Sequence, residues 1–263
     1  MLDLVTTTRF DKRMGSGRTK PILLACDRDD ADELEIVTKL SAGCDRGVGA
    51  LVAEAIAAML AADLGLPTPQ PFLVRINPDF IALIPDAEIR ALAERSAPIA
   101  FGSEKLPPGF SGWPVNKPLS ASLRDAAAEI FAFDAIIANA DRRPENPNCL
   151  SNGKGLAIFD HELAFLIEGV VGWRPPWETG ALEDLRLTCK HVFFTALQSK
   201  PVNLARFTGA WASISDARLR QYRAALPPEW ADDKGLTERA LVYISQVRDN
   251  IQPAIAEIAR ILI

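Results

Sequence analysis

The stretch that decides the fold covers residues 139–148 and reads NADRRPENPN, and residues 158–162, further along, read IFDHE. In the first segment Asp141 and Asn146 have four residues between them, and Asp160 follows 14 residues after Asn146. The first segment is a polar loop after a helical pattern, and Asp160 ends a short apolar run typical of a strand. The sequence therefore predicts a helix, a polar loop and a hairpin whose second strand ends in a carboxylate.

This arrangement of oxygen-bearing side chains suits phosphoryl transfer. Such an enzyme needs one carboxylate to orient the accepting hydroxyl or take its proton, and an amide oxygen and a second carboxylate to hold Mg²⁺ against the phosphates. We interpret Asp141 as the base, and Asn146 and Asp160 as the metal ligands. The structural alternative is that Asp and Asn cap turns, as they commonly do in loops. The added carboxylate at a strand end favours the catalytic interpretation.

Composition limits the classes of protein that the chain can belong to. The 263 residues are 48% hydrophobic and 24% charged, as in a protein with a buried core, and suffice for two lobes that share a cleft. A net charge of −5 argues against a broad grip on nucleic acid, so we expect no direct nucleic-acid binding. The four cysteines form no CxxC pair, so we expect no zinc site. Their scattered positions fit reduced thiols in a reducing compartment better than a disulfide framework.

The sequence shows neither a signal peptide nor a membrane-spanning stretch. The N-terminal segment has no apolar signal core, and the most apolar stretch, residues 50–66, is interrupted by Glu54 and Asp63. We therefore expect a cytoplasmic protein that makes no contact with a membrane.

Periodicity predicts the order of the elements. Before residue 85 we expect strands at 21–27, 34–40, 72–76 and 80–84, with a helix at 47–65 that ends at Gly65. Residues 85–122 are rich in Gly, Pro and Ser and read as an irregular connection. A helix from Leu123, a hairpin at 149–160 with an Asn-Gly turn, and helices after residue 182 follow. The last helix, 237–263, is expected to kink at Pro253.

These elements predict an α+β protein with two lobes. We expect an N-lobe at 1–84 with the strands and one helix, and a connecting segment at 85–122. A helical C-lobe at 123–263 would hold the polar loop and the metal-binding hairpin.

The D-R-x-x-x-N loop followed by apolar-Asp-His-x-Leu-Ala-Phe resembles HipA-like kinases and, more remotely, the phosphatidylinositol 3- and 4-kinases. The likeness extends to GSGRTKP, LEIVTKL and a helix with a Glu before LGLPTP, and so covers roughly residues 15–166. It implies a bilobal protein-kinase-like fold, with a small β-rich N-lobe and a larger helical C-lobe. It also implies serine/threonine kinase activity with ATP and Mg²⁺. Some members are toxins of toxin–antitoxin pairs, which implies an antitoxin or other regulatory partner beside a protein substrate.

The resemblance also assigns roles to single residues. Asp141 would be the catalytic base, and Asn146 and Asp160 the magnesium ligands. Lys39 would hold the α- and β-phosphates and pair with Glu54. A phosphate-covering segment would consist of five residues: Gly15, Ser16, Gly17, Arg18 and Thr19. From the residues alone, Lys39 and Glu54 could equally point to solvent, and the glycines could mark a flexible tail.

One position departs from the family pattern. Many members carry His two residues after the catalytic Asp, where this chain has Arg143. An Arg cannot donate and accept a proton in turn, but it can bind phosphate or acceptor charge. We count Arg143 among the catalytic residues on that ground, and Arg142 as another side chain that could neutralise charge.

Two other functions remain open at this point. The chain could be a nucleotide-binding regulatory module with little catalysis, although such a module has no need of Asp141. It could also be a small-molecule or lipid kinase, and its acidity argues against the lipid version. Trp173 and Trp177 could line an acceptor pocket, although anchoring a loop is the commoner role. We expect His161 to pack or hydrogen bond near the site.

Overall fold

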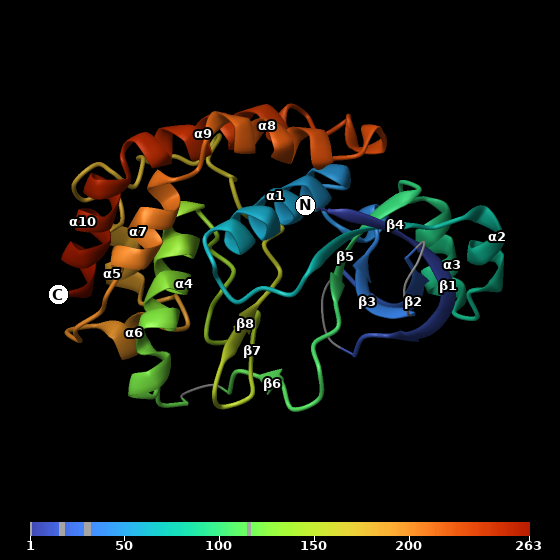
Figure 1. Cartoon of the computed structure of the whole chain (residues 1–263), viewed down its shortest axis with the longest axis horizontal. Coiled ribbons are helices and arrows are strands. Elements are labelled where there is room, and N and C mark those ends of the chain that lie inside the picture. The colour runs from blue at the N-terminus through green and yellow to red at the C-terminus, as the bar shows by residue number, and fades with distance from the viewer. Residues whose placement is uncertain (1, 16–18, 29–32, 115–116) are drawn as a thin grey trace. The chain divides into compact units, whose positions relative to one another are not determined.

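Five strands near the N-terminus close into a barrel (Figure 1). In sequence they are β1 (Asp3–Arg13), β2 (Ile22–Asp27), β3 (Leu34–Lys39), β4 (Pro71–Arg75) and β5 (Ile99–Glu104), and around the barrel their order is β1-β2-β3-β5-β4. Strand β1 closes the barrel because it pairs antiparallel with β2 on one side and parallel with β4 on the other. Closure leaves no strand edge free to pair with another chain.

The computed structural model describes residues 2–15, 19–28, 33–114 and 117–263. The fold is of the mixed α+β class, as expected. By its internal contacts the chain divides into two compact units. The first comprises Met1–Met59, Pro69–Leu106 and Arg220–Thr237, and the second comprises Leu60–Thr68, Pro107–Leu219 and Glu238–Ile263.

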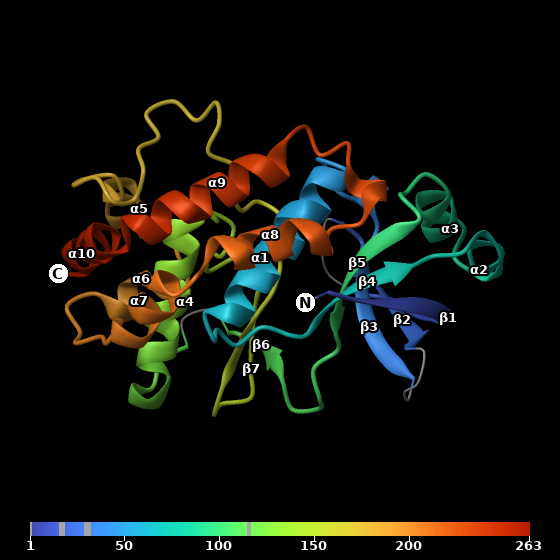
Figure 2. The same ribbon diagram turned by 45° about the horizontal axis from the view of Figure 1, so that its top comes forward.

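In the first unit, two short helices cover one side of the barrel: α2 (Pro78–Leu83) and α3 (Ala87–Glu94), which Figure 2 shows beside β1 and β4. Apolar side chains from the strands and from both helices form one core. Its most buried members are Val5, Ile22, Leu24, Cys26, Ile36, Val74 and Ile89. The unit also includes the turn Pro228–Trp230, whose Trp230 indole donates to the Ile99 carbonyl oxygen at 2.8 Å.

Two expectations about this region are wrong, and one strand was not expected. The strand expected at 80–84 is helix α2, because Asn77 and Pro78 begin a helix there and proline suits the first helical turn. Residues 85–122 are not irregular throughout, since they contain α3, begun by the Asp86 carboxylate that caps two backbone N–H groups, and strand β5. The sequence reading also lacked β1. The lobe boundaries at 84 and 122 stay a prediction.

Helix α1 (Val48–Asp63) is confirmed, and it is buried all round rather than amphipathic. Each side chain from Ala50 to Ala61 is buried, including that of Glu54. A helix without a polar face needs apolar neighbours on every side, which explains its run of alanines. Gly65 follows its end with φ of 67°, the left-handed conformation that glycine adopts easily.

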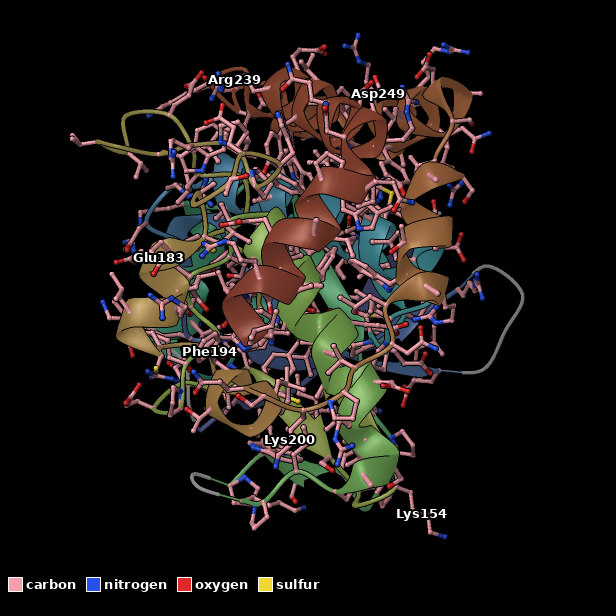
Figure 3. The ribbon with its side chains drawn as sticks, turned by 90° about the vertical axis from the view of Figure 1, so that its left-hand side faces the viewer. Lys154, Glu183, Phe194, Lys200, Arg239 and Asp249 are labelled. Atoms are coloured by element: carbon pink, nitrogen blue, oxygen red, sulfur yellow. The ribbon has the colours of Figure 1, made fainter. Side chains whose placement is uncertain are left out.

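The second unit contains α4 (Arg124–Ile136), α5 (Glu183–Thr188), α6 (Phe194–Leu197), α7 (Ala205–Ala212), α8 (Asp216–Ala225, which ends in the first unit), α9 (Leu236–Asp249, which begins there) and α10 (Ile251–Leu262). Of these helices, α6 and α10 pack against α4. Helix α10 lies against α4, α5 and α7, as Figure 3 shows for the red-brown α10 and the green α4. Arg260 of α10 pairs with Glu183 of α5 at 2.9 Å.

The expected helix at 237–263 is two helices, and the break lies at Asn250 rather than at Pro253. Pro253 is the third residue of α10, where its missing N–H costs nothing because the first N–H groups of a helix have no intrahelical partner. The expected hairpin is confirmed as β7 (Cys149–Ser151) and β8 (Leu156–Ile158), with β6 (Ser111–Gly112) paired to β7.

All four cysteines are free thiols, and Cys26, Cys44 and Cys149 are buried. Burial raises the pKa of the Cys26 thiol to about 12 and that of Cys149 to about 11. Among the described residues, no helix combines the length and the apolar character needed to cross a bilayer.

Gly102 of β5 allows the packing of the barrel interior to be tested by mutation. A Cβ atom added there would lie 2.4 Å from Ile36 Cγ2 and 2.6 Å from Val74 Cγ2. We expect Gly102→Ala to lower the free energy of unfolding by about 1–3 kcal/mol through overpacking. Urea denaturation measures this change. The control is Gly209→Ala in α7, where nothing lies within 4 Å of the new Cβ and a gain of about 0.5–1 kcal/mol is expected.

Candidate active site

Helix α4 delivers the chain to the polar loop. The helix ends at Ile136, Ala138 takes a left-handed φ of 56°, and the Asn139 N–H bonds to the Asp134 carbonyl oxygen at 2.9 Å. The chain therefore reverses directly after the helix. From α9, the Tyr243 hydroxyl donates to the Ile136 carbonyl oxygen at 2.6 Å and so supports this end of the helix.

The carboxylate of Asp141 is oriented by three side-chain donors. Its Oδ2 accepts from Asn146 Nδ2 at 2.8 Å and from Asn148 Nδ2 at 3.1 Å. Its Oδ1 accepts from Arg143 Nη2 at 3.1 Å. Backbone hydrogen bonds between Arg143 and Asn146 in both directions keep the loop narrow. The predicted base and one predicted metal ligand are thus in direct contact.

Asp160 lies two residues after the end of strand β8, and the residue between them is bonded to this loop. Strand β8 ends at Ile158, and the next residue, Phe159, donates its N–H to the Asn148 carbonyl oxygen at 3.2 Å. Asp160 itself has φ of 63°, a conformation that non-glycine residues seldom adopt outside functional or strained sites. Its side chain is half-buried. The hydrogen bond therefore joins the chain two residues after Asn146 to the chain one residue before Asp160.

These side chains fit a magnesium ion. The amide nitrogen of Asn146 is used by Asp141, which leaves the amide oxygen for a cation. One amide oxygen and one carboxylate are typical Mg²⁺ ligands, since this ion keeps several waters and takes phosphate oxygens as well. Within the described ranges, no three His, Cys, Asp or Glu side chains gather as a metal-binding group.

Beneath the loop lies a buried polar network around Arg142, whose side chain is 0% exposed. Its Nε donates to Asp134 Oδ2 at 2.6 Å. Its Nη1 donates to two carbonyl oxygens, those of Asn148 and, at 3.2 Å, of Phe159. Its Nη2 lies 3.0 Å from His161 Nε2, which confirms that His161 bonds near the site. Arg142 is therefore not available to neutralise phosphate charge, and that expectation is wrong.

Asp134, on α4, is the counter-ion of Arg142. Burial alone would raise the pKa of Asp134, but the charge of Arg142 and the hydrogen bond from His191 outweigh it and hold this pKa far below its usual range. Asn139 Nδ2 also donates to it, at 2.7 Å. The sequence reading missed Asp134, His191 and the role of Asn148. The one available signal was a lone acidic residue inside the apolar run IFAFDAII.

His191 is held in one neutral tautomer. Its Nδ1 accepts the Phe193 N–H at 3.2 Å, so its Nε2 carries the hydrogen and donates to Asp134 Oδ2 at 3.1 Å. Burial lowers the pKa of His191, and the neighbouring Asp134 only partly offsets this. The ring packs against Phe131 with centroids 4.9 Å apart.

In the first unit, Lys39 and Glu54 form the ion pair expected from the resemblance. Lys39 ends β3, Glu54 lies on α1, and Nζ is 3.0 Å from Oε2. The side chains are 11% and 3% exposed. Charged side chains are seldom this buried unless they are paired, and a buried ion pair is stable only when its geometry is good.

The phosphate-covering segment is described only at its ends. Ser16, Gly17 and Arg18 lie outside the described residues. Gly15 and Thr19 are described, and Thr19 is buried. The Met14 N–H bonds to the Pro21 carbonyl oxygen at 2.9 Å, so the segment connects the antiparallel strands β1 and β2. Trp173 and Trp177 lie with ring centroids 6.0 Å and 6.1 Å from Tyr243, as loop anchors do.

A model of the HipA-like kinase family matches residues 8–256, and the chain therefore belongs to this family. Among solved structures, the crystal structure of the Helicobacter pylori proinflammatory kinase CtkA has a similar fold. The two chains are 12% identical with a TM-score of 0.51, over 99% of this chain and 98% of that one. At this identity the likeness shows the fold alone. No protein with a curated description matches the chain.

The buried network predicts a large effect of Asp134→Asn on stability. The substitution keeps the shape of the side chain but leaves the guanidinium of Arg142 buried without its counter-ion, which costs about 3–5 kcal/mol of unfolding free energy. Urea denaturation at pH 7 measures it. Glu33→Gln, which removes one of the two carboxylates paired with the exposed Arg9, is the control and should cost less than about 1 kcal/mol. Equal effects of the two variants would contradict the assignment.

The lowered pKa of His191 predicts that the stability of the protein depends on pH. Its pKa in the folded protein is below the value of about 6.5 in the unfolded chain, so only the unfolded chain takes up this proton just below pH 6.5. We therefore expect this contribution to stability to be complete above that pH and to decline as the pH falls below about 6.5. His191→Phe, which keeps an aromatic ring beside Phe131, should flatten the stability profile below that pH. Parallel profiles for the two proteins would rule this out.

Proposed function

We propose that the chain is an ATP- and magnesium-dependent kinase that transfers the γ-phosphoryl group to a hydroxyl, with a protein serine or threonine as acceptor. One observation carries the proposal: the Asp141 carboxylate is oriented by Asn146 and Asn148 on a loop hydrogen-bonded to the segment that ends in Asp160. Membership of the HipA-like kinase family supports the same reaction class.

In the proposed mechanism Asp141 orients the accepting hydroxyl and takes its proton. Its Oδ2 is occupied by two amide donors, so the carboxylate has a defined direction before the acceptor arrives. The oxygen of Asn146 and the carboxylate of Asp160 would hold Mg²⁺, and the bound ion would supply positive charge that neutralises the phosphates.

The remaining roles belong to the first unit and to Arg143. Lys39, oriented by Glu54, would hold the α- and β-phosphates, and residues 15–19 would cover them. We propose a bilobal kinase-like protein with an N-lobe at 1–84, a connection at 85–122 and a C-lobe at 123–263. Arg143, exposed beside Asp141, would bind phosphate or acceptor charge. A protein acceptor, a cytoplasmic location and an antitoxin or regulatory partner are proposed from the family alone.

One observation favours a second candidate, a nucleotide-binding regulatory module with little catalysis. The guanidinium of Arg143 bonds to Asp141 Oδ1, the oxygen that its two amide neighbours leave for a hydroxyl. In an active kinase this side chain must move or be drawn to phosphate when ATP binds. In a module it would stay and block the acceptor.

The test uses ATP labelled in the γ-phosphate with Mg²⁺, alone and with cell lysate. We expect label transfer by the wild type, a loss of about 10²–10⁴-fold in Asp141→Ala, and ATP binding retained in that variant. Glu145→Ala, in the same loop, exposed and without an assigned role, is the control and should transfer normally. Transfer that survives Asp141→Ala would remove Asp141 from its role. Nucleotide binding by the wild type without any transfer would favour the module.

A further inference from the structure

Arg142 is bonded to both of the segments that carry the proposed catalytic groups. Its Nη1 donates to the Asn148 carbonyl oxygen in the loop and to the Phe159 carbonyl oxygen beside Asp160. Asp141 is its neighbour in the chain. One guanidinium group therefore contacts the backbone of both segments, although it is buried and cannot touch a ligand itself.

Asn148 completes the connection between the two carboxylates. Its side-chain amide donates to Asp141 Oδ2, and its carbonyl oxygen accepts from both Arg142 and the Phe159 N–H. A path of hydrogen bonds thus leads from the Asp141 carboxylate through Asn148 to the residue before Asp160. A shift of the Asn148 backbone would therefore disturb hydrogen bonds to both of these segments.

Asp134 and His191 fix the direction of the guanidinium. Asp134 lies on α4, the central helix of this unit, and accepts from both Nε and Nη2 of Arg142. His191 donates to the same carboxylate from the segment before α6. The guanidinium is therefore anchored to two elements that lie outside the loop as well as to the loop itself.

We propose that Arg142, anchored by Asp134 and His191, is a positioning residue that sets the separation between Asp141 and Asp160. The inference rests on the proposed function, since it concerns the same phosphoryl-transfer site. The planar fork of an arginine reaches a carboxylate and two carbonyl oxygens at once. A lysine at this position keeps the charge next to Asp134 but has a single nitrogen, and it cannot hold both carbonyls in the same geometry.

The test compares Arg142→Lys with the wild type in two measurements. In the kinase assay we expect the Mg²⁺ concentration for half-maximal rate to rise about 10–100-fold, as for other residues that orient metal ligands, with the KM for ATP little changed at saturating Mg²⁺. In spectra of protein labelled with ¹⁵N at asparagine, the side-chain NH₂ signals of Asn146 and Asn148 should shift, because both groups bond to Asp141.

Arg206→Lys is the matched control. Arg206 also bonds from Nε to a carboxylate of α4, that of Glu129, at 3.0 Å, and from Nη1 to a backbone carbonyl oxygen, that of Leu64, at 2.8 Å. Its bonds lead to neither Asp141 nor Asp160. We expect its magnesium dependence and the two asparagine side-chain signals to match the wild type. A shift in the control as large as in Arg142→Lys would overturn the proposal.

Two further outcomes have a defined meaning. If Arg142→Lys does not fold, His191→Phe takes its place, since it removes one donor to Asp134 and should shift the same signals in a milder way. If the wild type transfers no phosphoryl group, the proposed function fails, and the asparagine signals still decide the positioning role. Unchanged signals and unchanged magnesium dependence in a folded variant would show a purely structural Arg142 and overturn the inference.

Discussion

The buried ion pair between Arg142 and Asp134 is the interaction on which the catalytic loop depends. Two charges without solvent are stable only if nearly every donor and acceptor finds a partner. Arg142 meets this condition by combining one carboxylate, two backbone carbonyls and one imidazole. Because the buried charge of Arg142 needs all of these partners, it holds α4, the loop and the end of β8 in one arrangement. A surface arginine, with water as an alternative partner, would impose no such order.

Most of the candidate site was predictable from the sequence because its signals are local. The spacing of Asp141, Asn146 and Asp160 and the apolar strand before Asp160 lie within about twenty residues of each other. The contact between Lys39 and Glu54 came from the family resemblance and is present. The supporting network was not predictable, because Asp134 and His191 are 57 residues apart and nothing in either neighbourhood indicates the other. Only the fold brings them together.

The fold shows the same division between local and distant information. Helix α1 and the hairpin β7–β8 follow from hydrophobic periodicity and an Asn-Gly turn. Strand β1 is different, since its burial alternates weakly and its partner β4 is found far along the chain. Helix α2 is the instructive error: the run FIALI suits a strand, but Asn77 and Pro78 immediately before it begin a helix. Local start signals here outweigh strand propensity.

The distribution of the thiols has a practical consequence. Cys26, Cys44 and Cys149 are buried, and for Cys26 and Cys149 a raised pKa further suppresses the thiolate that reacts with alkylating reagents. Cys189 is exposed, directly after α5 and two residues before His191. A maleimide dye or a nitroxide added to the folded, unaltered chain should therefore attach at this single position. The native sequence thus carries its own spectroscopic handle close to the anchor of the catalytic loop.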